Sequence, residues 1–196
     1  MEFYLECKKN NIKPIIGIEL TYDNAILLLY AKNLNGYKNL IKLSTIKSDR
    51  ELTIEELLQY KDNLILIMPF SSYTEKIYNL YEDKYIGYSS DEERQKIKEN
   101  AVPINNVKYL LKKDSIYLDY VNMIKEGKML GEYELHTMTS NYLLTPEEIS
   151  KIKDTDIKNT IDIANKCNVE LTYTPDLLPI YDKSIDSKKF LSDLSH

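Results

Sequence analysis

The sequence lacks the features that stabilise secreted proteins or anchor membrane proteins. Its 196 residues include two cysteines, Cys7 and Cys167, and no tryptophan, and no apolar run approaches the length needed to span a bilayer. Two cysteines so far apart in sequence do not resemble the disulfide framework of a small secreted domain. We therefore expect a cytoplasmic protein that has both thiols free and makes no contact with a membrane.

An excess of positive charge is also missing. The chain carries 26 Lys and Arg against 31 Asp and Glu, which gives a formal net charge of −5. A protein that binds nucleic acid unaided needs a basic surface to neutralise phosphates. Any contact with DNA is therefore expected to belong to a neighbouring domain.

Short apolar segments alternate with helical patterns through the first two thirds of the chain. Runs of β-branched and aliphatic residues predict strands, and apolar residues three or four positions apart predict helices. Strands are expected at residues 15–20, 25–31, 64–68, 85–88 and 101–104, and helices at residues 37–44, 53–60, 73–80 and 91–100. This succession predicts a parallel α/β sheet or barrel in one domain, followed by a tail.

The most informative segment is residues 12–19, which read Ile-Lys-Pro-Ile-Ile-Gly-Ile-Glu. Pro14 cannot donate to a β-ladder, so it suits the first residue of a strand, and the isoleucines that follow predict a strand buried on both faces. Glu19 would end that strand, and barrel folds build active sites from such positions. A single glutamate is more commonly solvated or hydrogen-bonded than catalytic, so both interpretations stand at this point.

Capping and turn signals mark the ends of several helices. Thr53 and Glu56 have the spacing of a capping box, and Thr145 followed by Pro146 and two glutamates is a second helix start. The last third is predicted to be mainly helical. Its expected elements are a helix at residues 114–126 that stops at Gly127, a helix that begins at Thr145, a helix that ends at Asn168, and a first helical turn at residues 190–194.

Several of these segments, in the same order, resemble the DnaE type of bacterial replicative DNA polymerase III alpha subunits. Residues 12–19 are similar to that family's Gly-Ile-Lys-Pro-Ile-Ile-Gly-x-Glu signature, and residues 28–44 to its Leu-Leu-Ala-Lys-Asn-x-x-Gly-Tyr-x-Asn-Leu stretch. Further matches occur at residues 107–110, 124–128, 142–148, 159–171, 178–179 and 190–194. The PolC type interrupts this region with an inserted exonuclease, for which the present chain has no room.

The resemblance implies a polymerase and histidinol phosphatase (PHP) domain, which folds in that family as a distorted β/α barrel of seven strands. The first strands would precede Met1, so the barrel is expected to be incomplete, with a mainly helical C-terminal third. An incomplete sheet leaves an edge that must pair or be covered, and self-association is therefore expected. We assign residues 1–175 to the PHP domain and residues 176–196 to a linker and the start of the following polymerase region.

The resemblance also implies where a metal site would lie. Active PHP sites hold divalent metals through several His, Asp, Glu and Cys side chains, because phosphoester hydrolysis needs metals in an anionic cage. Here the family's glutamate is kept as Glu19, but the other positions are substituted: Ile26, Phe70, Asn106 and Lys108. The His-x-His and Thr-Asp-His segments would precede Met1. His136 and His196 fall on no matching motif, and we interpret them as surface side chains.

We therefore expect a vestigial site with no catalytic residue and no metal, in which Glu19 pairs with Lys108. The chain would act as a scaffold within a DNA-directed DNA polymerase, a nucleotidyltransferase whose magnesium site lies elsewhere in the longer chain. Its partners would be the rest of that chain, the proofreading exonuclease and other replisome subunits, and it would meet DNA only through them. Two alternatives stand: an active metal-dependent PHP phosphoesterase or 3′-5′ exonuclease, and a stand-alone interaction protein.

Overall fold

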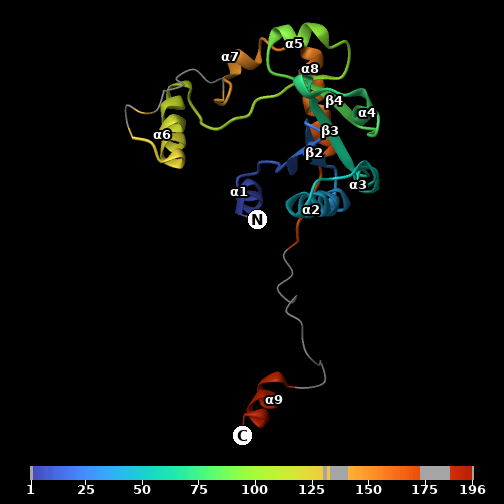
Figure 1. The fold of residues 1–196 in the computed structure, drawn as a ribbon, viewed down its shortest axis with the longest axis vertical. Coiled ribbons are helices and arrows are strands. Elements are labelled where there is room, and N and C mark those ends of the chain that lie inside the picture. The colour runs from blue at the N-terminus through green and yellow to red at the C-terminus, as the bar shows by residue number, and fades with distance from the viewer. Residues whose placement is uncertain (1, 130–131, 133–140, 173–185, 196) are drawn as a thin grey trace.

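The computed structural model describes residues 2–129, 132, 141–172 and 186–195 (Figure 1). His136, His196 and residues 176–185 of the expected linker region 176–196 lie outside these residues. The described part contains one sheet of five strands, arranged side by side in the order in which they follow along the chain. The strands are β1 (Gly17–Tyr22), β2 (Ala25–Ala31), β3 (Leu64–Pro69), β4 (Lys84–Tyr88) and β5 (Ala101–Pro103).

The sheet is mixed and open, which corrects the expectation of a purely parallel one. Strands β1, β2 and β3 pair antiparallel, whereas β3, β4 and β5 pair parallel. The cause of the first pairing is the two-residue turn at Asp23 and Asn24, whose φ angles of 48° and 62° are left-handed. Asp and Asn tolerate that conformation, and two such residues between strands make a tight hairpin.

The same hairpin changes the environment of the Glu19 segment. Strand β1 lies at the edge of the sheet, and its exposed residues alternate with partly buried ones and the buried Leu20, so it is not buried on both faces. Glu19 was expected at the end of its strand, but β1 continues to Tyr22 before it turns, so Glu19 lies in mid-strand. The prediction that this segment is a strand is confirmed, and its predicted burial is wrong.

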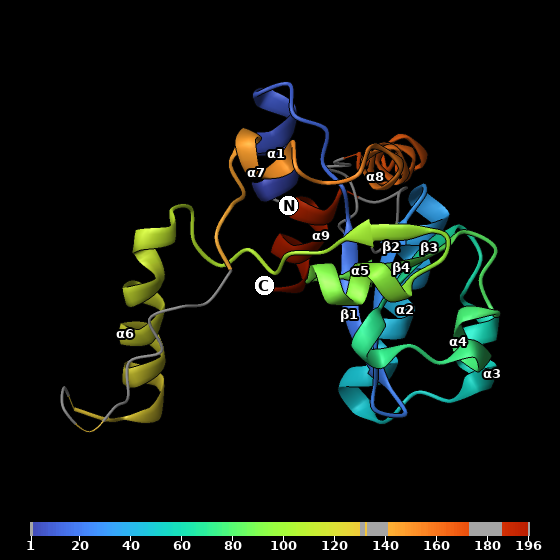
Figure 2. The same ribbon diagram turned by 90° about the horizontal axis from the view of Figure 1, so that it is seen from above.

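Helices cover both faces of the sheet (Figure 2). On one face lie α2 (Leu34–Asp49), α3 (Ile54–Gln59) and α4 (Glu75–Tyr78), and on the other lies α8 (Asp154–Lys166). The larger core forms under the first group and has seven fully buried residues: Leu27, Leu29, Ala31, Leu43, Leu57, Leu66 and Met68. The smaller core lies under α8 and includes Ile65, Val102, Ile163 and Cys167. The chain therefore forms an α/β/α arrangement around the sheet.

The remaining helices are short or stand away from the sheet. They are α1 (Glu2–Lys9), α5 (Asp91–Lys96), α6 (Ser115–Glu126), α7 (Pro146–Ile149) and α9 (Ser187–Leu194), together with single 3₁₀ turns at Phe70–Ser72 and Lys112–Asp114. Helix α5 ends earlier than expected, because Ile97 turns into the core with 4% of its area exposed. No helix among the described residues is both long and apolar enough to cross a membrane.

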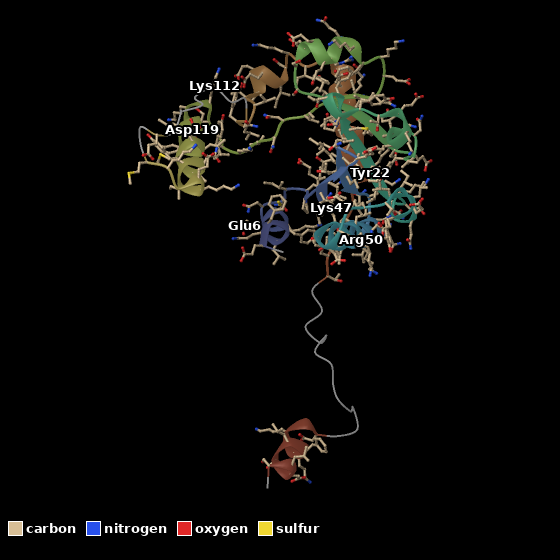
Figure 3. The ribbon with its side chains drawn as sticks, in the orientation of Figure 1. Glu6, Tyr22, Lys47, Arg50, Lys112 and Asp119 are labelled. Carbon is tan, nitrogen blue, oxygen red and sulfur yellow. The ribbon has the colours of Figure 1, made fainter. Side chains whose placement is uncertain are left out.

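Both expected capping boxes are confirmed. The Thr53 hydroxyl accepts a bond from the backbone N–H of Glu56, and the Glu56 carboxylate accepts one from the backbone N–H of Thr53. Arg50, labelled at the end of α2 in Figure 3, adds an ion pair to Glu56. The bonds from Arg50 and from the Thr53 backbone lower the pKa of Glu56 to about 2. A second capping box, between Thr145 and Glu148, begins α7.

Candidate functional site

On its face of the sheet, helix α8 lies over β5 and leaves part of β2 uncovered. A cleft of about 1110 Å³ lies there. Its floor is apolar and comes from the half-buried side chains of Ile26, Leu28, Tyr30 and Ile104, together with the buried Ile67. Its polar lining includes Glu19, Asp91, Asn105, Asn106 and Asn141. The cleft therefore combines a hydrophobic floor with an amide-rich and acidic rim.

The hairpin register places Glu19 on this cleft. Glu19 stands opposite Leu28, and Gly17 stands opposite Tyr30. A Cβ atom at Gly17 would lie 2.6 Å from the Tyr30 ring, so the ring fits there only because residue 17 has no side chain. Burial raises the pKa of the Tyr30 phenol, and the Cys167 and Glu19 groups act in the same direction. Glu19 thus carries its charge beside an apolar, aromatic floor.

The structure brings together three of the five positions that the family resemblance indicated. Glu19, Ile26 and Asn106 all line the cleft. Phe70 is not among the lining residues and packs instead against the small cluster of Tyr88, Ile97 and Ala101.

Lys108 also lies outside the cleft lining, and its backbone N–H donates to the Asn141 carbonyl at 2.7 Å. The expected pair between Glu19 and Lys108 is not among the ion pairs of the described residues. The segment between β5 and Lys108 therefore places this residue outside the position that the sequence suggested.

The donor groups in the cleft do not fit a catalytic metal cluster. Among the residues that line it, only Glu19 and Asp91 are ionisable carboxylates, and none is a histidine or cysteine. Within the described ranges, no three His, Cys, Asp or Glu side chains gather closely enough to hold an ion. A hydrolytic metal site needs several anionic or imidazole ligands at short spacing, so the floor formed by Ile26 and its neighbours is unsuited to one.

Sequence reasoning missed a buried ion pair at one end of the cleft. Asp156 of α8 is 1% exposed. Its carboxylate accepts hydrogen bonds from the Nε and Nη2 groups of Arg94 in α5, the latter at 2.9 Å. The hydroxyls of Tyr88 and Thr155 each donate to its carboxylate at 3.0 Å. Four donors therefore satisfy this buried charge, and Tyr88, which lines the cleft, links the pair to it. No local signal reveals the pair, since 62 residues separate its partners.

A second charged cluster fastens the other end of α8. Lys166 pairs with Asp83 at 2.8 Å and with Asp162 at 2.7 Å, and Lys32 reaches the same Asp83 at 2.6 Å. The Tyr85 hydroxyl donates to Asp162 at 2.7 Å. Hydrogen bonds that the Lys166 ammonium donates to the carboxylates of Asp162 and Asp83, in that order, raise the pKa of Lys166 well above its ordinary value. These ion pairs hold α8 over the sheet and so set one wall of the cleft.

An open α/β sheet with three of the five expected PHP ligand positions in one cleft is consistent with the class that the sequence resembles. The family model of the PHP domain matches residues 1–123, and the chain belongs to that family. It is similar to the DNA polymerase III subunit alpha of three bacteria. Identity is 30% over 99% of this chain for Ureaplasma parvum, 29% over 90% for Halalkalibacterium halodurans, and 31% over 97% for Staphylococcus aureus.

The chain spans only about a fifth of the length of these relatives, since it covers 19%, 20% and 19% of them. The matched region is the PHP domain, and the likeness extends over the helical last third. The fold class and the family that the sequence predicted are thus confirmed for the region that the chain shares with these relatives.

Proposed function

We propose that the chain serves as the PHP region of a replicative DNA polymerase III alpha subunit, with a scaffolding role and no catalytic metal of its own. The similarity to three such subunits over 90–99% of the chain supports the first part. The donor set of the cleft supports the second: a single family carboxylate, Glu19, faces an isoleucine and an asparagine where the resemblance places ligands.

In this proposal the polymerase chemistry and its magnesium ions belong to the rest of the longer chain. The PHP region would support that polymerase core and provide contacts for other replisome subunits, the proofreading exonuclease among them. Exposed apolar side chains suit such contacts: on α6, Tyr117, Val121 and Ile124 follow one another at helical spacing with 60–74% of their area exposed. The reading frame that flanks the coding sequence tests the assignment, because it should continue into the polymerase domains.

Metal analysis tests the proposed loss of the metal site. The purified chain, incubated with Zn²⁺ and Mn²⁺ and then desalted, is expected to retain substoichiometric metal, because one carboxylate cannot hold an ion against free exchange. Glu19→Ala should give the same low value. Stoichiometric zinc or manganese in the unsubstituted chain, lost on Glu19→Ala, would establish the active phosphoesterase instead.

A further inference from the structure

Helix α6 exposes its apolar side and buries a polar one. The side chains of Tyr117, Val121 and Ile124, called here the α6 stripe, have the spacing of neighbours on one helix face and are 60–74% exposed. Asp119 lies on the opposite side and is 3% exposed, and its Oδ2 atom has no hydrogen-bond partner among the residues that the structure describes. A surface helix ordinarily turns its apolar side inward, so the reversed order in α6 indicates that the α6 stripe serves a contact with another surface.

The polypeptide on the two sides of α6 is fastened together at its base. Tyr109 and Tyr142 form a β-bridge. The side-chain amide of Asn105 donates to the Tyr142 carbonyl at 2.7 Å, and that of Asn141 donates to the Asn106 carbonyl at 2.8 Å. Helix α6 itself stands away from the sheet in both views (Figures 1 and 2). The α6 stripe therefore belongs to an internal segment with an anchored base, at a distance from the sheet and its edges.

Lysines flank the α6 stripe at both ends. Lys125 follows Val121 by one helical turn, and Lys113 lies in the 3₁₀ turn just before α6. Both are exposed, and neither is among the ion pairs of the described residues. The nearby carboxylates are engaged elsewhere, since Asp114 accepts a backbone N–H of its 3₁₀ turn at 3.2 Å and Glu126 is in an ion pair at 2.7 Å. The α6 stripe is therefore an apolar surface with a positive charge at each end.

This charge pattern disfavours pairing between two copies of α6. In a parallel pair each lysine would meet its own equivalent, and in an antiparallel pair Lys113 would meet Lys125. Like charges would face each other in both arrangements, which costs binding energy. An occupant with a carboxylate at each end of its apolar face would meet the two lysines favourably. Charge complementarity therefore selects an acidic partner over a second copy of this chain.

We propose that the α6 stripe is a docking site for an amphipathic helix of a separate protein. That helix presents apolar side chains at the spacing of the α6 stripe, with an Asp or Glu beside each end of them. The apolar faces pack together, and the two carboxylates meet Lys113 and Lys125. The inference names the surface and the partner chemistry of the scaffolding role, and it rests on that proposed function. The metal analysis tests the role without involving α6, so a failure of the docking site and a failure of the role are distinguishable.

A labelled peptide tests this docking site on the full chain. The probe is Glu-Ala-Gln-Ala-Leu-Ala-Gln-Ala-Leu-Ala-Ala-Leu-Glu-Ala, whose leucines have the spacing of the α6 stripe and whose glutamates have the spacing of Lys113 and Lys125. Fluorescence anisotropy measures its binding. We expect Val121→Asp to weaken binding about tenfold or more, because it places a charge at the centre of the apolar contact, and the matched Ile161→Asp on α8 to leave it within about twofold. Val121 and Ile161 are 60% and 53% exposed, so both variants should fold, which circular dichroism confirms.

A charge exchange at the two lysines completes the test. Lys113→Glu together with Lys125→Glu should weaken the glutamate peptide and favour a peptide that carries lysine at both glutamate positions, because the charge at each end of the α6 stripe is reversed. Equal binding of the two peptides would overturn the proposed acidic partner.

Four other results would also overturn the proposal. They are no saturable binding up to about 1 mM, equal binding by the Val121 and Ile161 variants, a dimer of the unsubstituted chain that Val121→Asp converts to monomer, and loss of peptide binding in a longer chain that includes the polymerase region. The third result would assign the α6 stripe to a second copy, and the fourth would assign it to the rest of its own chain.

Discussion

Replacement of Asp156 by alanine is expected to lower the free energy of unfolding by about 3–5 kcal/mol, the cost of breaking a buried ion pair by removing one partner. The substitution leaves the Arg94 guanidinium, 16% exposed, without the carboxylate that receives two of its nitrogens. It also leaves the Tyr88 hydroxyl without its acceptor. Urea denaturation followed by circular dichroism measures the loss.

Asp162→Ala is the matched control on the same helix. The Asp162 side chain is 50% exposed in its pair with Lys166, and solvent screens such a pair, so its removal should cost about 1 kcal/mol or less. Similar losses for the two substitutions would contradict the view that burial makes the Asp156 pair important. A loss near zero for Asp156→Ala would show that α5 and α8 are held together by other contacts.

The same carboxylate predicts a pH dependence of stability. Burial alone would raise the pKa of Asp156, but hydrogen bonds from Arg94, Tyr88 and Thr155 outweigh it and hold the pKa below the ordinary 3.8. A lowered pKa means that the stabilisation is present above pH 3.8 and is lost as the pH falls through the lower folded value. The difference in unfolding free energy between the unsubstituted chain and Asp156→Asn should therefore be constant near neutral pH and shrink below about pH 4.

Local patterns predicted most of the elements. Strand β2 has the expected bounds, 25–31, because its run of aliphatic residues is flanked by turn-forming residues on both sides. Gly127 ends α6 with a left-handed φ of 66°, as its residue type indicated. Capping and turn chemistry act within a few residues, so the sequence alone contains the information.

The directions of the strands and the buried contacts could not be predicted in this way. The residue types of Asp23 and Asn24 favour a two-residue hairpin turn, but a parallel sheet was expected and the turn was not predicted. Only the family resemblance predicted that Glu19, Ile26 and Asn106 lie at one site, because no local sequence pattern relates these three positions. The Asp156 pair depends on how α5 and α8 pack, and such long-range contacts follow from topology rather than from spacing.

Among the glycines that the structure describes, Gly36 is the one whose substitution should cost most. It lies buried in the first turn of α2, where a Cβ atom would overlap the backbone carbonyl oxygen of Asn63 and lie 3.3 Å from the Cα atom of Ala31. That carbonyl accepts the backbone N–H of Lys32 at 2.9 Å, and the Asn33 side-chain amide donates to the Asn63 side chain at 2.8 Å. Neither backbone segment can move without breaking these bonds, so α2 must shift away from the start of β3.

We therefore expect Gly36→Ala to lower the free energy of unfolding by about 2–4 kcal/mol, the sum of an overpacking cost and about one lost hydrogen bond. In a helix without such a contact, the same change stabilises by about 0.5–1 kcal/mol, so the sign of the effect is itself diagnostic. Asn35→Ala, at the exposed neighbouring position, controls for helix propensity and should stay within about 0.5 kcal/mol of the unsubstituted chain. Thermal and urea unfolding of the two variants decide the matter, and a stabilised Gly36→Ala would show that α2 does not press against Asn63.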